Sequence, residues 1–215
     1  MDPTTSAHAS NGAQRGTHRG VAPARLAPHQ KGARESGRVI AFLDETGFTF
    51  RARVGTTWAP TGCAPVLKRL AKRRVVSSLV AVTAPLDGAP PRLYARHFLT
   101  PIHGADVIIG LRHFRARVGA PLLIIWDHLQ AHRARCVRDY LARHPDDFAV
   151  EWLPGYAPEL NPEEPCNNAV KLAMLNAIPS TVDELRALAR RNFIRLGHKP
   201  HLLNSFFRYV GLDVT

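Results

Sequence analysis

The sequence predicts an α/β fold in which helices flank a mixed β-sheet. Short apolar runs typical of strands fill residues 38–98, and apolar runs then alternate with segments of helical spacing. The run "LLIIW", residues 122–126, is continuously apolar, which is typical of a strand buried on both faces. Strands joined by tight turns pair antiparallel, whereas strands joined by helices pair parallel. Both kinds of connection are expected here, so the sheet should be mixed.

The first half of the chain predicts strands. "RVIAFLDETGF" indicates a strand that stops at an acid–glycine turn, and "FTFRARVGTTWAP" indicates a second strand or extended arm. "VVSSLVAVTA" and "RLYARHFL" flank the turn cluster "APLDGAPP", which favours a hairpin.

The second half predicts helices between strands. The spacing of apolar residues indicates a helix over 105–118, and a buried strand follows over 120–127. We then expect an amphipathic helix over 131–145 that Pro145 ends, and a strand in "FAVEWLP". After the loop "GYAPELNPEEP" come two helices, at about 164–175 and 181–196.

Composition points to one globular domain with a polyanionic partner. The 215 residues carry 29 Lys and Arg against 17 Asp and Glu, a formal charge of +12. Such an excess favours nucleic acid as the partner, although a basic surface that serves only solubility is the alternative. No apolar run reaches the roughly 18 residues that a membrane span needs. The first residues lack the apolar core of a secretion signal, so we expect a cytoplasmic protein.

Two basic segments and three cysteines complete the composition. Residues 1–37 are rich in small, polar and basic residues, which predicts a disordered basic tail before a single domain over 38–215. Five bases, which we expect to contact phosphates, stand within seven residues: Lys68, Arg69, Lys72, Arg73 and Arg74. Cys63, Cys136 and Cys166 stand far apart without a CxxC pair, so they indicate free thiols instead of a disulfide frame or a zinc site.

Acidic residues stand where two strands end and where a later helix begins. Asp44 is expected to end the first strand, Asp127 ends the most buried strand, and Glu163 and Glu164 open a helix. Each has an ordinary structural explanation: a turn aspartate, an N-cap, or first-turn acids that favour the helix dipole. A parallel strand beside the first would bring both aspartates to one edge of the sheet.

Three acids gathered at that edge would require a cation. Carboxylates at close range repel one another unless a positive charge neutralises them. Ligation by oxygen alone selects hard ions, Mg²⁺ or Mn²⁺, over zinc. Two such ions can clamp the attacking and leaving oxygens of a phosphodiester displacement, which fits a basic protein that acts on nucleic acid.

The motifs "FLDETGF", "LLIIWDHLQAH" and "WLPGYAPELNPEE", in that order, resemble the three signature blocks of DDE transposases. The likeness is greatest to bacterial insertion-sequence transposases of the mariner-like superfamily and covers residues 38–212, including the closing "SFFRYVGL". The resemblance implies a ribonuclease-H-like fold and a site with two Mg²⁺ or Mn²⁺ ions. It also implies cleavage of DNA at transposon ends, followed by strand transfer into target DNA.

Carried over residue by residue, the catalytic and metal-binding acids of the family fall on Asp44, Asp127 and Glu164. Glu163 occupies the variable slot of the "NPxE" pattern, and 36 residues separate Asp127 from Glu164. Lys171 matches a lysine of the same block, for which the resemblance implies a position near DNA; a solvated helix lysine is the alternative.

His132 matches the histidine of the family's "D-x-x-x-x-H" block, where a structural role and a chemical role are both open. The chain departs from the family pattern at three places. His128 stands where asparagine is frequent, Asn167 stands where tryptophan is common, and Pro165 directly follows the third acid. His128 is either near the metal and DNA or an exposed surface histidine.

The resemblance also implies a homodimer on DNA in the bacterial nucleoid. Family members usually carry an N-terminal helix-turn-helix, which the tail does not resemble, so an upstream helix-turn-helix polypeptide is an expected partner. Two alternatives stay open: a decayed or split transposase remnant that binds DNA without cutting it, and a ribonuclease-H-like nuclease. A serine or cysteine hydrolase and a histidine zinc site are poorly supported, because the chain has neither a nucleophile elbow nor an HExxH motif.

Overall fold

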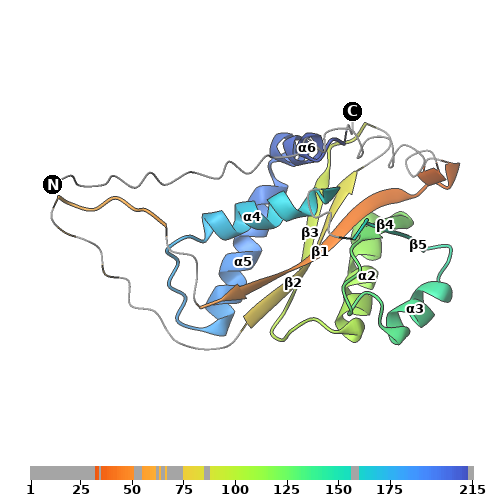
Figure 1. Cartoon of the computed structure of the whole chain (residues 1–215), viewed down its shortest axis with the longest axis horizontal. Coiled ribbons are helices and arrows are strands. Elements are labelled where there is room, and N and C mark those ends of the chain that lie inside the picture. The colour runs from red at the N-terminus through yellow and green to blue at the C-terminus, as the bar shows by residue number, and fades with distance from the viewer. Residues whose placement is uncertain are drawn as a thin grey trace, which may run out of the picture.

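The computed structural model describes residues 32–33, 35–50, 55–61, 63, 66, 75–84, 88–155 and 160–212. Its strands are β1 (Val39–Thr49), β2 (Val75–Ala84), β3 (Arg92–Phe98), β4 (Leu122–Trp126) and β5 (Phe148–Trp152). Its helices are α2 (Gly104–Val118), α3 (Arg135–Ala142), α4 (Glu163–Ala173), α5 (Val182–Gly197) and α6 (Pro200–Tyr209). Figure 1 shows α4, α5 and α6 on one side of the sheet and α2 and α3 on the other.

The five strands form one mixed sheet in the order β3-β2-β1-β4-β5. β1, β2 and β3 pair antiparallel, as the expected hairpin requires. β4 pairs parallel with β1 and with β5, and helices make both of these connections. The predicted mixed sheet flanked by helices is confirmed, including a buried β4 beside the first strand.

The first strand is longer than the sequence indicated. β1 runs unbroken from Val39 to Thr49, so the expectation that Asp44 ends the strand is wrong. The reason is the partner strand, because β2 pairs with β1 from Ile40 opposite Ala84 to Thr49 opposite Val75 and carries the ladder through the predicted turn. Of the second strand or extended arm expected over 48–60, residues 48–49 belong to β1, residues 55–60 form no strand, and residues 51–54 lie outside the described residues.

Two hydrophobic cores lie on opposite faces of the sheet. Alternate residues of a strand point to opposite faces. Ile40 and Phe42 enter the core beneath α4, α5 and α6, where the rings of Phe42 and Phe207 meet edge to face at 5.8 Å. Ala41 and Leu43 enter the core beneath α2 and α3. The same alternation directs residue 44 toward α4 and residue 45 toward α2.

Two helices differ from expectation. The helix expected from residue 131 begins at Arg135, because residues 130–133 form a turn in which the amides of His132 and Arg133 both bond to the carbonyl of Leu129. α6 was not predicted, although Pro200 stands in its first turn, a favoured place for proline. Within the described ranges, no helix is long and apolar enough to cross a membrane.

Some expectations fall on residues that the structure does not describe. The five bases expected to contact phosphates, Lys68, Arg69, Lys72, Arg73 and Arg74, lie outside the described residues, as do residues 1–31 of the expected tail. The domain boundary expected at residue 38 stays a prediction, and Ala33, just before it, is buried in the core beneath α4–α6. All three cysteines are free, as predicted.

Candidate active site

Asp44 and Asp127 lie side by side on neighbouring parallel strands. The ladder between β1 and β4 ends with Phe42 opposite Ile125. Continuing that register by two residues places Asp44 opposite Asp127, just past the end of β4. The two charges act on each other, because Asp127 raises the pKa of Asp44. The sheet therefore brings together the two aspartates that the sequence analysis singled out.

Asp44 is a largely buried carboxyl group with a raised pKa. Burial is the main cause, and the charge of Asp127 adds to it. Hydrogen bonds oppose the rise: one to Glu163, and one in which the backbone N–H of Glu45 donates to Oδ1 at 2.7 Å. Asp44 points toward α4, so the residue that opens this helix becomes its neighbour.

Glu163 is the glutamate that meets Asp44. It is 0 % exposed, and its Oε2 accepts a 2.6 Å hydrogen bond from Nδ2 of Asn167, one turn later in α4. Asn161 holds the start of the helix by accepting from the amide of Glu163 at 3.1 Å. Burial first, and the charge of Asp44 second, raise the pKa of Glu163 well above its usual value.

The contact between Glu163 and Asp44 contains a proton in the absence of a cation. Two carboxylates cannot bond to each other unless one of them is protonated. The interaction between the two acids lowers the pKa of Asp44 and raises that of Glu163, so Glu163 is the more readily protonated of the pair. Its Oε1 is buried and has no hydrogen-bond partner among the described residues. A buried polar oxygen of this kind is a candidate metal ligand.

Glu164, the third acid expected from the resemblance, lies one residue further along the same helical turn. It is half-buried, and its charge is among the causes that raise the pKa of Glu163. Sequence reasoning placed Glu163 in a variable slot and so missed its contact with Asp44. A signal was present, because Glu163, Cys166, Asn167 and Val170 have the spacing of one helix face, and all four are buried.

Asp127 is held by its neighbours in the loop after β4. The backbone N–H of Leu129 donates to its Oδ1 at 3.1 Å, and Nδ1 of His132 lies 3.0 Å from the same oxygen. The hydrogen bond from His132 is the main cause of the lowered pKa of Asp127, and partial burial opposes it. Asp127 thus stays ionised while about half of its side chain remains open to solvent.

His132 bridges the two faces of the site. Its side chain is fully buried and stacks on the ring of Trp126, with centroids 4.4 Å apart. Nε2 lies 3.5 Å from Oε1 of Glu45. Burial lowers the pKa of His132, but Asp127 and Glu45 together outweigh burial and raise it to about 9. A protonated ring donates from both nitrogens, which fixes the orientation of the Asp127 carboxylate.

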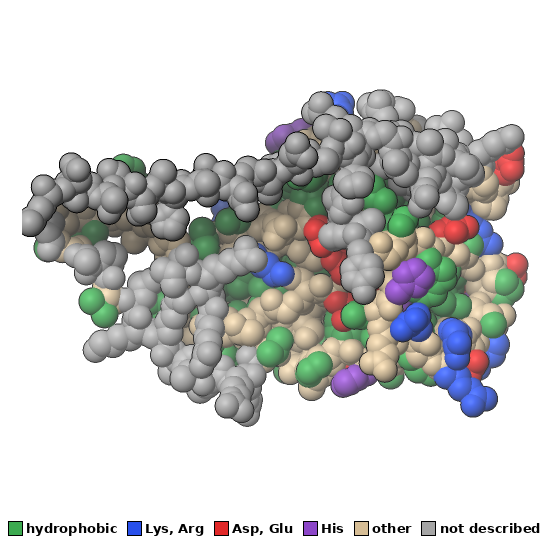
Figure 2. Space-filling view, viewed as in Figure 1, with side chains coloured by type: hydrophobic (Ala, Val, Ile, Leu, Met, Phe, Trp, Pro, Cys, Tyr) green, Lys and Arg blue, Asp and Glu red, His purple; other side chains and the backbone are tan. Residues whose placement is uncertain are grey.

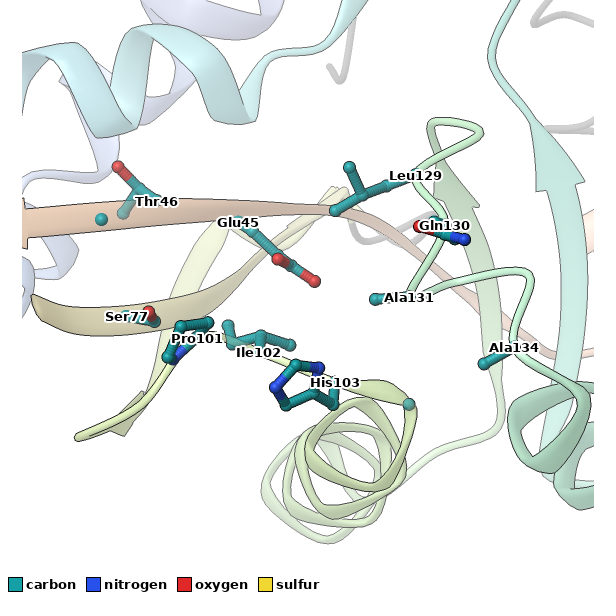
Figure 3. Close-up of a pocket in the computed structure, with 12 residues that line it drawn as sticks. Glu45, Thr46, Ser77, Pro101, Ile102, His103, Leu129, Gln130, Ala131 and Ala134 are labelled. Carbon is teal, nitrogen blue, oxygen red and sulfur yellow. The ribbon is translucent and has the colours of Figure 1, made fainter.

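A hollow of about 670 Å³ lies on the other face of β1, beside the start of α2. Figure 3 shows Glu45 pointing into it, with Leu129 and Gln130 of the loop after β4 above and His103 below. Figure 2 shows acidic side chains toward the middle of the viewed face, with basic side chains on either side of them. Of the acids described above, Glu45 lines this hollow.

The remaining predicted residues lie close to this centre. Lys171, on α4, lowers the pKa of Glu163 through its charge, so it acts on the acids as well as being available to a phosphate. His128 is exposed and stacks on Trp152, with ring centroids 4.9 Å apart. It extends an aromatic row with Trp126 and His132 along the ends of β4 and β5.

The donor set suits a hard divalent cation. It consists of carboxylate oxygens, which Mg²⁺ and Mn²⁺ prefer. Burial first, and a neighbouring carboxylate after it, raise the pKa values of Asp44 and Glu163, and Oε1 of Glu163 is a buried acceptor without a hydrogen-bond partner among the described residues. Within the described ranges, however, no three Asp, Glu, His or Cys side chains already have the arrangement of a metal site. The residues fit a cation by the chemistry of their oxygen donors.

Solved structures similar to this fold are Mos1 transposase complexes. The Mos1 paired-end complex with left transposon end is 14% identical, with a TM-score of 0.53 over 100% of this chain and 68% of that one. A pre-cleavage Mos1 transpososome gives 15% identity and a TM-score of 0.55 over 88% of this chain and 60% of that one. The catalytic domain of Mos1 mariner transposase gives 15% identity and 0.50 over 88% and 90%. The expected ribonuclease-H-like fold is confirmed.

Among curated proteins, none matches the sequence. The model of the DDE superfamily endonuclease family, in contrast, matches residues 39–186. The match spans the sheet, the loop after β4 and the start of α4, and so includes both aspartates and both glutamates of the candidate site. On this evidence the chain belongs to the DDE superfamily endonuclease family.

Proposed function

We propose that this chain is the catalytic domain of a DNA transposase. It cuts DNA at the ends of an insertion-sequence element and joins the freed 3′-hydroxyl to target DNA. The observation that carries the proposal is the position of Asp44 on β1 and of Asp127 directly after the adjacent parallel strand β4, with Glu163 of the first turn of α4 acting on Asp44. Membership of the endonuclease family supports it.

The proposed cofactor is a pair of Mg²⁺ or Mn²⁺ ions. When bound, two such ions supply electrostatic stabilisation of the attacking and leaving oxygens. Mos1 paired-end complexes are known with Mn and with Mg, which supports the choice of ions. Asp44 and Asp127 would hold them, together with Glu163 and Glu164 from the start of α4.

The protein's own groups prepare the carboxylates for this task. His132 and the amide of Leu129 fix Asp127, and the amide of Glu45 fixes Asp44. The proton on Glu163 must leave when a cation binds, because a protonated carboxyl is a poor ligand. Burial of Asp44 and Glu163 keeps water away from one side of the site, which strengthens the attraction between carboxylate and cation.

The remaining proposals concern partners and location. Lys171 and the bases of residues 68–74 would contact DNA phosphates, which position the substrate without reading its sequence. A homodimer on DNA and an upstream helix-turn-helix polypeptide are the proposed protein partners. The Mos1 structures are complexes with transposon ends, which supports the DNA partner. The bacterial nucleoid is the proposed location.

A second candidate function is DNA binding without cleavage, as in a decayed transposase. One observation favours it, namely that within the described part of the chain no three potential ligands already stand in a metal-holding arrangement. In addition, the side-chain amide of Asn167 donates a hydrogen bond to Oε2 of Glu163. Activity separates the two functions.

The test is cleavage and joining by the purified full-length chain. Duplexes covering the genomic sequence on either side of the reading frame serve as donor DNA, and a supercoiled plasmid serves as target. With Mn²⁺ or Mg²⁺ the wild type should cut the donor and join it to the plasmid, and Asp127→Asn should do neither. Binding without either reaction, with and without a helix-turn-helix partner, would establish the second function instead.

A further inference from the structure

A basic hollow lies at the edge of the sheet opposite β5. It has a volume of about 800 Å³ and lies between the edge strand β3, helix α2 and helix α5. Four arginines line it from three elements: Arg96 from β3, Arg117 from α2, and Arg186 and Arg190 from α5. The last two are four residues apart and so share one face of α5. All four are exposed to solvent.

The positive charge of the hollow is largely uncompensated. Its lining contains one acid, Asp183, which already pairs with Arg186 at 2.8 Å. Among the described residues, no ion pair is recorded for Arg96, Arg117 or Arg190. Like charges that converge on a concave surface repel one another, and a bound polyanion removes that cost. The arginines come from three separate elements, so the fold itself creates the concentration of charge.

The effect of this charge is visible on a neighbouring side chain. His97 also lines the hollow, and Ser78 Oγ lies 2.7 Å from its Nδ1. Burial, followed by the charges of Arg190, Arg186 and Arg96, lowers the pKa of His97 to about 4. The imidazole is therefore neutral at neutral pH, and the arginines are the cationic groups of the hollow.

The hollow is level with the candidate active site. In the ladders of the sheet, Asp44 pairs with Val80, and Val80 pairs with Ala95, the residue before Arg96. Adjacent strands lie about 4.8 Å apart, so the backbone of β3 lies about 10 Å from that of β1 at this level. Helices cover both faces of the sheet between Asp44 and β3, so a polyanion would reach these arginines over the outer surface of the molecule.

We propose that the hollow between β3, α2 and α5 binds the phosphate backbone of duplex DNA beyond the point of cleavage. The planar guanidinium groups suit phosphate oxygens, which they can bind in a bidentate manner. The contact is independent of sequence, because backbone phosphates carry none. The choice of DNA as the polyanion rests on the proposed transposase function. The positive charge of the hollow is independent of that function, because the lining arginines create it.

The experiment measures binding in EDTA, where cleavage is absent. The full-length chain is titrated into a fluorescein-labelled duplex of arbitrary sequence, and anisotropy is followed over a range of KCl concentrations. The variant that tests the hollow carries both Arg117→Ala and Arg190→Ala. The matched control removes two exposed arginines elsewhere, Arg138→Ala on α3 with Arg208→Ala on α6. Circular dichroism and melting temperature check folding, and Arg117→Gln with Arg190→Gln replaces the alanine pair if it does not fold.

Loss of two phosphate contacts should reduce the slope of log K against log[salt] by about 2 and weaken binding at low salt. The control should keep the wild-type slope, since its arginines are not expected to contact the duplex. Equal slopes for the Arg117→Ala with Arg190→Ala variant and the wild type would overturn the proposal. Inorganic phosphate is also titrated into the wild type and the Arg117→Ala with Arg190→Ala variant without DNA; saturable phosphate binding that the variant loses, together with an unchanged slope for the duplex, would identify the ligand as free phosphate and overturn the proposal.

The outcome separates this inference from the proposed function. The binding assay is run in EDTA, so its slope does not depend on whether the chain cuts DNA. If the chain proves inactive but the Arg117→Ala with Arg190→Ala variant shows the reduced slope, the transposase proposal fails. DNA binding at the hollow is then still supported. If the chain cuts DNA and the Arg117→Ala with Arg190→Ala variant binds the duplex as the wild type does, only the proposal of DNA binding at the hollow is refuted.

Discussion

Replacing Glu163 by glutamine tests which glutamate of α4 completes the site. The change keeps the shape of a fully buried side chain and removes its charge. Two charges about 4 Å apart at an effective dielectric constant of 20 interact by about 4 kcal/mol. Desolvation and rearrangement offset much of the lost attraction for a divalent cation. We therefore expect Glu163→Gln to weaken Mn²⁺ binding by at least about tenfold, or roughly 1.4 kcal/mol.

The same substitution should have the opposite effect on the metal-free protein. Because the pKa of Glu163 is raised, the folded state binds more protons than the unfolded state above the ordinary pKa of a glutamate, and stability falls as the pH rises. Glutamine carries no charge, and its Nε2 can donate to Asp44 as the protonated glutamate does. Glu163→Gln should thus melt at a higher temperature than the wild type in EDTA at neutral pH.

The assay is thermal melting with increasing Mn²⁺, supported by calorimetric titration. Wild type should gain stability with Mn²⁺, since a ligand that binds only the folded state stabilises it. Glu163→Gln should gain much less. Glu164→Gln removes the other glutamate proposed to hold the ions and should lose less of the gain, because Glu164 is half-buried whereas Glu163 is fully buried. A normal response of Glu163→Gln, with a lost response of Glu164→Gln, would refute the reasoning and return the third ligand to the position that the resemblance implied.

Other substitutions test the remaining features. His132→Ala should weaken Mn²⁺ binding and raise the pKa of Asp127, read by NMR titration of its carboxyl carbon, whereas His128→Ala should raise that pKa much less, because its charge is the smallest of the causes; equal effects would exclude a positioning role for His132. Because the pKa of His97 is about 4, stability should fall as the pH drops from about 6.5 to about 4, by at most about 3 kcal/mol; His97→Gln should flatten this dependence in urea denaturation. Phe207→Ala should cost about 3–5 kcal/mol in the same assay, since its fully buried ring packs on Phe42; a cost below 1 kcal/mol would contradict this packing.

The central sheet and its two aspartates could be predicted because their signals are local. The apolar run 122–126 reads as a strand buried on both faces, and helical connections imply parallel pairing with the first strand. The length of β1 could not be predicted in this way. Gly47 follows the pattern of a turn, yet pairing with Ser77 of β2 keeps it extended, and this partner lies 30 residues away in the sequence.

The contact of Glu163 with Asp44 depends on the rotation of α4. Adjacent helical residues point about 100° apart, so the rotation of α4 about its own axis decides which of Glu163 and Glu164 faces the site. Cys166 and Val170 set this rotation by entering the core, and their positions match the face of Glu163. Local sequence patterns could not predict the basic hollow, because its arginines come from elements that only the fold brings together.

Metal-dependent strand cutting tests the central claim most directly. Supercoiled plasmid is incubated with the full-length wild type or with Asp127→Asn in Mn²⁺, Mg²⁺ or EDTA, and the rate of conversion to nicked circles is measured. Our assignment predicts nicking by the wild type with either ion, none in EDTA, and none by Asp127→Asn under any condition. Nicking by Asp127→Asn at the wild-type rate, or nicking that persists in EDTA, would contradict it.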